Sequence, residues 1–227
     1  NPGAGLYQAH FNLIDSHGAV IRKCKAMPEW MSPEEFLAAI MTTRMDIMGT
    51  GFMMRAEDYD RVRGLPDYPN LLFADFEMII NLVGEKGFCA SPKTLFSFRI
   101  HNSTTSISSD LKMQLGFERF VRFLIKLKEK SPSFDKVIVE NGASLVRFYC
   151  KGLSHRLLRT PKSSRNGLTV ASFIQKCREF AVELTGSDDF DPLADHTIRM
   201  AKVLDSTSFT RGLFLLFKKI YPKPVLK

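Results

Sequence analysis

The hydrophobic pattern of this 227-residue chain changes near residue 106, and that change limits the folds available to it. Up to that point, short runs of alternating apolar residues are separated by stretches with helical spacing, which is typical of an α/β fold. Beyond it, every periodic stretch is helical. We therefore predict an α/β domain at 1–106 followed by an all-α domain at 107–227.

The first segment contains runs that predict β-strands at 5–14, 19–23, 52–54 and 94–101. The first two are expected to form a hairpin, and the third is expected to be buried. In the last run, Phe96, Phe98 and Ile100 alternate with polar residues. Because successive side chains point to opposite faces of a strand, Arg99 and His101 share the other face. A basic residue beside a histidine suits an anion or a metal ion, and a solvated sheet face is the plainer alternative.

Helix boundaries are also marked in the sequence. The residues SPEE at 32–35 form a capping box with proline at the first helical position. Asp75 begins another helix, which Gly87 ends, and an aspartate in that place is also an ordinary N-cap. Further helices are predicted at 111–128, 137–158, 170–184 and 193–204.

The charge of the chain is concentrated in its second half. Residues 107–227 carry 22 Lys and Arg against 12 Asp and Glu, whereas residues 1–106 carry 10 against 12. Such a basic half suits phosphates, an anionic membrane or a charged substrate. No nucleic acid is expected, because the basic residues are not interleaved with aromatic side chains that could stack on bases.

Cysteine spacing and hydropathy indicate the compartment. The four cysteines lie far apart, which argues against both a disulfide framework and a zinc site. Neither a signal peptide nor an apolar run of about 18–20 residues is visible. We therefore expect a cytoplasmic protein.

Three elements, taken in order, carry the candidate chemistry. They are the loop of Gly49, Thr50 and Gly51, the helix start at Asp75, and the passage FRIHNSTTS at 98–106. Together with NPGAGLY at the start of the chain and LIDSHG shortly after it, this order resembles the family 2 glycosyltransferases, which are inverting enzymes with a GT-A fold. The resemblance covers residues 1 to about 106. It implies that these residues are the acceptor-side half of a GT-A domain, to which a helical C-terminal region is joined.

The resemblance also implies roles for particular residues. Asp75 matches the catalytic base, which takes the proton from the attacking acceptor hydroxyl. His101 matches a histidine close to the divalent metal and the diphosphate leaving group. Because Arg99 shares the strand face of His101, we expect it to be a further contact of the diphosphate. The loop 49–51 matches the segment that lines the donor-sugar and acceptor site. The metal, Mn²⁺ or Mg²⁺, would act as a Lewis acid on the departing nucleotide.

The implied reaction is the transfer of one sugar, with inversion, from a nucleotide-sugar donor to a saccharide or lipid-linked acceptor. We therefore expect the implied enzyme to take part in the biosynthesis of cell-surface polysaccharide or glycan. A single transfer is expected because the QxxRW motif of polymerising members is absent, its nearest match being QKCRE at 175–179.

Two departures from the family pattern favour an alternative. Ala74 stands where the family commonly has a glutamate before the base. The DxD metal motif of the family precedes the passage that opens this sequence, so the acidic metal ligands and the nucleotide-binding half are expected outside it. The isolated chain is therefore expected to be inactive. The alternative is a non-catalytic binding or scaffolding module that retains the acceptor-side half of the fold.

The C-terminal segment 210–227 groups apolar residues with basic ones. This is the composition of a helix that lies on an anionic membrane surface, which would place the protein peripherally on the inner face of the membrane. The alternative is a terminal helix packed on the core, with its basic end favourable for the helix dipole.

Overall fold

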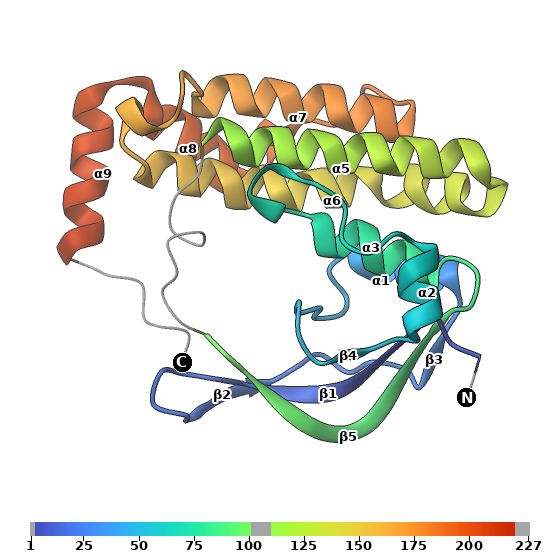
Figure 1. The fold of residues 1–227 in the computed structure, drawn as a ribbon. Helices are drawn as coiled ribbons and strands as arrows, with labels where there is room; N and C mark the ends of the chain where they lie inside the picture. Colours follow the sequence, from blue (N-terminus) through green and yellow to red (C-terminus); the bar gives the residue numbers. More distant parts are fainter. Residues whose placement is uncertain (1–2, 101–109, 221–227) are drawn as a thin grey trace.

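The computed structural model of the chain describes residues 3–100 and 110–220, and it contains a curled sheet covered on one side by helices (Figure 1). The strands of the sheet are β1 (Leu6–Ile14), β2 (Val20–Lys23), β3 (Trp30–Met31), β4 (Phe52–Met53) and β5 (Phe88–Arg99). The mixed α/β class predicted for the first segment is confirmed at this level.

The two long strands, β1 and β5, form the middle of the sheet and run parallel to each other. The predicted hairpin is confirmed, since β2 pairs antiparallel with β1. On the outer side of β5, β3 pairs antiparallel with it. The order is β2-β1-β5-β3, and β4 also pairs with β1. The ring of Phe96 on β5 stacks on Phe11 of β1 at 4.8 Å between centroids, as the predicted core face requires.

The expectation of a buried strand at 52–54 is wrong. β4 is only two residues long, and Met53 is 70% exposed. The short strand pairs with one end of β1 and receives no covering layer over Met53, so its apolar side chain stays in solvent.

The helices of the first segment are α1 (Pro33–Met41), α2 (Ala56–Arg61) and α3 (Ala74–Val83). The predicted capping box of α1 is confirmed: the Ser32 hydroxyl accepts from the Glu35 N–H, and the Glu35 carboxylate accepts from the Ser32 N–H. The prediction that Gly87 ends this helix is wrong, because α3 ends at Val83 and its C-cap is Gly84. Gly87 does have the expected left-handed conformation, with a φ of +76°, in the turn that leads from α3 to β5.

The second segment is helical as predicted. Its helices are α5 (Leu111–Lys130), α6 (Pro132–Arg159), α7 (Val170–Thr185), α8 (His196–Ser206) and α9 (Ser208–Ile220). Short 3₁₀ turns also occur at η1 (Pro69–Leu71), η2 (Lys162–Ser164) and η3 (Pro192–Ala194). Helices α5, α6 and α7 lie side by side above the sheet, with α1 and α3 between them and the strands (Figure 1). No helix among the described residues is long and apolar enough to cross a membrane.

One hydrophobic core runs through both segments. The ring of Phe73, just before α3, stacks on Phe120 of α5 at 5.4 Å and lies 4.9 Å from Tyr149 of α6. The start of α3 is therefore packed directly against the helical layer.

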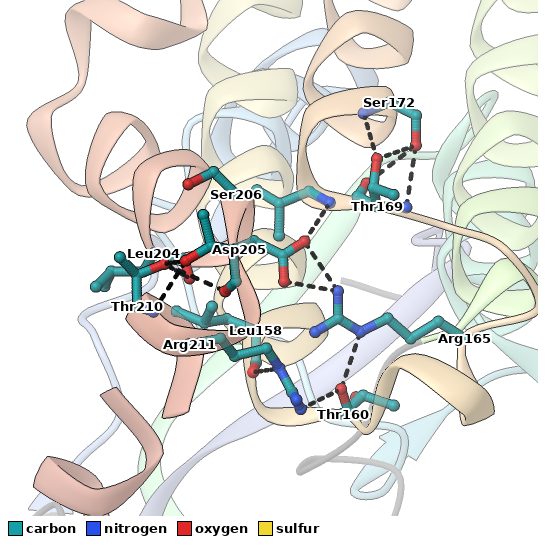
Figure 2. Close-up of polar contacts among 12 residues, drawn as sticks. Leu158, Thr160, Arg165, Thr169, Ser172, Leu204, Asp205, Ser206, Thr210 and Arg211 are labelled. Carbon is teal, nitrogen blue, oxygen red and sulfur yellow. Dashed lines mark hydrogen bonds and ion pairs between the residues drawn. The ribbon is translucent and has the colours of Figure 1, made fainter. Parts of the chain in front are cut away.

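A buried polar cluster joins α6, α7, α8 and α9 at one end of that layer (Figure 2). Nη1 of Arg165 donates to both carboxylate oxygens of Asp205 at 2.9 Å, and its Nε donates to the Thr160 carbonyl. Arg211 of α9 donates to the carbonyls of Leu158 and Thr160. The last carbonyl groups of a helix have no hydrogen-bond partner within the helix. At the end of α6 the guanidinium groups of Arg165 and Arg211 supply these hydrogen bonds, and Arg211 thereby attaches the start of α9 to α6.

Candidate functional site

The candidate site is centred on Asp75, the second residue of α3. The N-cap alternative for Asp75 is wrong, because the N-cap residue is Phe73. Asn70, Leu71 and Phe73 all have positive φ, of 54°, 55° and 69°. Each such residue costs on the order of 1–3 kcal/mol, and persists only where the surroundings hold it. Here the buried ring of Phe73 holds the backbone, and the strained approach sets the direction in which α3 begins.

The surroundings of Asp75 change its acidity. Burial raises the pKa of the Asp75 carboxyl, and the hydrogen bond that Oδ1 accepts from the Phe76 N–H, at 3.0 Å, opposes this only in part. A carboxylate with a raised pKa is a stronger base than one in water, which suits abstraction of a hydroxyl proton. The chemistry predicted for Asp75 therefore fits its environment.

The glycine loop lies directly beside this carboxylate. A Cβ built on Gly49 would lie 3.5 Å from Oδ2 of Asp75. Gly51 lies at the other end of the loop, with a φ of +80°, and a Cβ there would come within 2.4 Å of the Phe96 ring. Thr50, between them, is exposed. The loop thus joins the start of α3 to the face of β5, and it brings two of the three predicted elements together.

Among the described residues, the hydrogen bonds of Arg99 involve neither the glycine loop nor Asp75. Its Nη1 donates to the carbonyls of Asp15 and Ser16, at 2.8 and 3.0 Å, in the turn between β1 and β2. These bonds tie β5 to the hairpin. The role of Arg99 as a diphosphate contact stays a prediction. His101, the predicted metal contact, lies outside the described residues.

Tyr149 is a member of this site that the sequence analysis missed. Burial and the nearby charge of Asp75 raise the pKa of its phenol, so the hydroxyl stays protonated. Arg156 lies seven residues further along α6. Burial lowers the pKa of its guanidinium, and the charge interaction with Tyr149 raises that pKa in part. No signal in the sequence could have found Tyr149, because it lies 74 positions from Asp75 within an ordinary helical stripe.

A cavity of about 270 Å³ lies next to these residues. Its walls include Met48, which precedes Gly49, together with Phe76 and Tyr149. Lys25 and Asp46 supply polar groups at its edge, with Asp46 held by Arg22 at 2.7 Å. Aromatic walls with a few polar groups are the usual lining of a site for a small organic molecule.

The predicted Mn²⁺ or Mg²⁺ can be compared with the side chains present. Among the described residues, no three His, Cys, Asp or Glu side chains gather where they could hold a metal ion. These ions require several hard oxygen ligands, and Asp75 alone does not supply them. The described residues therefore do not fit the metal by themselves.

No family model, curated protein or solved structure matches this chain.

Proposed function

We propose that this chain is the acceptor-side part of an inverting glycosyltransferase with a GT-A fold. In this proposal a sugar passes from a nucleotide-sugar donor to a hydroxyl of a saccharide or lipid-linked acceptor. The observation that carries the proposal is the position of Gly49 beside the Asp75 carboxyl, whose pKa is raised by burial: a Cβ added to Gly49 would lie 3.5 Å from Oδ2 of Asp75.

The proposed chemistry follows from that arrangement. Asp75 accepts the proton of the acceptor hydroxyl as its oxygen attacks the anomeric carbon of the donor sugar. The absence of a Cβ at Gly49 leaves the acceptor room to approach the carboxylate. Tyr149, kept as a neutral phenol, contributes a dipole without adding a second negative charge beside the base. In this proposal the donor nucleotide and its metal are held by residues outside this sequence.

Association with a membrane belongs to the same proposal. Helix α9 buries none of its side chains, which disfavours the alternative that it packs on the core. Its exposed Leu216 and Ile220 lie among Lys218 and Lys219. Such a helix suits the surface of an anionic membrane, where a lipid-linked acceptor would be found.

The test is the variant Asp75→Asn in the protein that contains this chain. The amide has the shape of the carboxylate without its basicity, so sugar transfer should fall by about 10²–10⁴-fold. Release of nucleotide diphosphate from a panel of sugar nucleotides gives the readout. Asp67→Asn, at an exposed loop position, is the matched control and should retain the parental rate. Normal transfer by Asp75→Asn would assign the base to another residue, and no transfer by the parent protein would favour the binding module.

A further inference from the structure

A groove of about 910 Å³ lies between α6, α8 and α9. It is separate from the cavity beside Asp75, with which it shares no lining residue. Helix α9 stands at a steep angle to α6 at the end of the helical layer (Figure 1). Residues of α9 line one side of the groove. A volume of this size is enough for an organic ligand, since such sites typically measure about 300–1,000 Å³.

The two sides of the groove have different chemistry. Helix α6 contributes a mainly basic wall of Lys151, Gly152, His155, Arg156 and Arg159. Helices α8 and α9 contribute a mainly apolar wall, made by Met200, Leu204, Leu213, Phe214 and Phe217, with Thr197 and Lys218 beside them. The described residues that line the groove include no aspartate or glutamate.

We propose that this groove binds one membrane phospholipid with a phosphomonoester headgroup, the chemistry of phosphatidic acid. The phosphate lies against the α6 wall, where the guanidinium of Arg159 can donate paired N–H groups to its oxygens. An acyl chain lies along the apolar wall and removes its surface from water. A choline-capped headgroup fits less well, because its ammonium would face a mainly basic wall, where the nearby carboxylate of Asp195 already pairs with Lys151 at 3.6 Å.

The surface around the groove points to a bilayer as the source of this lipid. Leu216 and Ile220, which do not line the groove, are 56% and 61% exposed on the same helix. The apolar surface therefore continues from the groove onto the outside of α9. Arg211 holds the base of α9 to the end of α6, so the two walls keep a defined separation (Figure 2). The proposal does not depend on the role of Asp75.

Gly152 provides a sharp test of the site. A Cβ added there would meet no atom within 4 Å, and leucine is a better helix former than glycine by about 0.8–1 kcal/mol. Gly152→Leu should therefore fold while its side chain fills the groove. Gly212→Leu is the matched control, because Gly212 also faces open space in a helix but does not line the groove. Arg159→Gln removes a charge from the basic wall, and Arg199→Gln removes an exposed charge of α8 outside it.

The experiment is calorimetric titration of the full chain with dioctanoyl phosphatidic acid below its critical micelle concentration. We expect saturable binding of one molecule per chain. Gly152→Leu should weaken it by about tenfold or more, and Arg159→Gln by about fivefold. Both control variants should bind as the parent does. Thermal unfolding of each variant establishes that the fold is intact.

Several outcomes would overturn the proposal. Equal affinity for dioctanoyl phosphatidylcholine would mean that the groove does not recognise the phosphomonoester. Equal affinity for inorganic phosphate would mean that the acyl chains do not contribute to binding. Undiminished binding by Gly152→Leu would place the ligand elsewhere. Binding that appears only after removal of residues 221–227 would make the chain's own terminus the occupant.

Discussion

Gly51 lies against the ring of Phe96 so closely that an added Cβ would be 2.4 Å from Cζ. The two residues are 45 positions apart in the sequence, and their contact determines how closely the loop 49–51 approaches β5. Since Gly51 also has a φ of +80°, both its backbone conformation and its surroundings require glycine.

Gly51→Ala should therefore destabilise the protein. The backbone conformation alone costs about 1–2 kcal/mol for a residue with a Cβ, and the Phe96 ring must also move off its stack with Phe11. Urea unfolding followed by circular dichroism measures the loss. Gly49→Ala in the same loop is the control, because its Cβ makes an ordinary 3.5 Å contact and should change stability by less than about 0.5 kcal/mol. Equal losses for the two variants would contradict this account of the loop.

Asp75 should make the stability of the protein depend on pH. Its folded-state pKa lies above its ordinary value of 3.8, so between these two values the folded chain holds a proton that the unfolded chain has lost. Stability therefore falls as pH rises through this window, and the deficit remains above it. Asp75→Asn does not titrate and should gain stability relative to the parent over the same range.

Urea unfolding of the parent and of Asp75→Asn at intervals from pH 3 to pH 8 measures this effect. The other titrating groups are common to both proteins and cancel in the difference. A difference in unfolding free energy that is constant with pH would mean that burial does not raise the pKa of Asp75.

The ion pair of Arg165 and Asp205 should be essential to the helical layer (Figure 2). Only 1% and 5% of their side chains are exposed, and Asp205 also accepts from the Val170 N–H at the start of α7. Asp205→Ala leaves a guanidinium buried without its carboxylate, which typically costs about 3–5 kcal/mol. Chemical denaturation gives the change in free energy.

The exposed pair of Lys176 and Glu179 provides the comparison for this variant. The Glu179 side chain is 47% exposed, so Glu179→Gln should cost less than about 1 kcal/mol. A similarly small loss of unfolding free energy for Asp205→Ala would show that water reaches Arg165 and that the ion pair is not buried.

Helix α9 should govern binding to anionic vesicles. The double variant Leu216→Gln, Ile220→Gln removes two exposed apolar side chains and should lower vesicle affinity by about tenfold or more for each. Raised salt should weaken binding by the parent, because it screens the lysines of α9. Co-sedimentation with vesicles measures both effects, and unfolding should be unchanged because neither side chain is buried. Val182→Gln, at an exposed apolar position on α7, is the control. If the parent, the double variant and Val182→Gln all sediment equally with vesicles, α9 does not contact the membrane.

Local features of this protein were predictable because their causes are local. The alternation of Phe96 and Phe98 predicted their shared face on β5, and the SPEE sequence predicted the start of α1, since a period or a cap involves only neighbouring residues. The helices after residue 110 followed from the 3.6-residue repeat in the same way.

The properties of the candidate site required the tertiary structure. Asp75 looked like an N-cap from its neighbours, and its raised pKa arises from burial at the start of α3, where Phe73 packs on Phe120 of α5 and Tyr149 of α6. Tyr149 is a partner of Asp75 only because α6 crosses the start of α3. The exposure of Met53 likewise depends on what covers β4, and not on its own apolar sequence. Burial and electrostatic environment are set by segments far apart in the chain. The amino-acid sequence alone therefore determined features with local causes, such as the capping box of α1, the hairpin of β1 and β2 and the helical character of the second segment. The packing of those elements decided the chemistry that each side chain can perform.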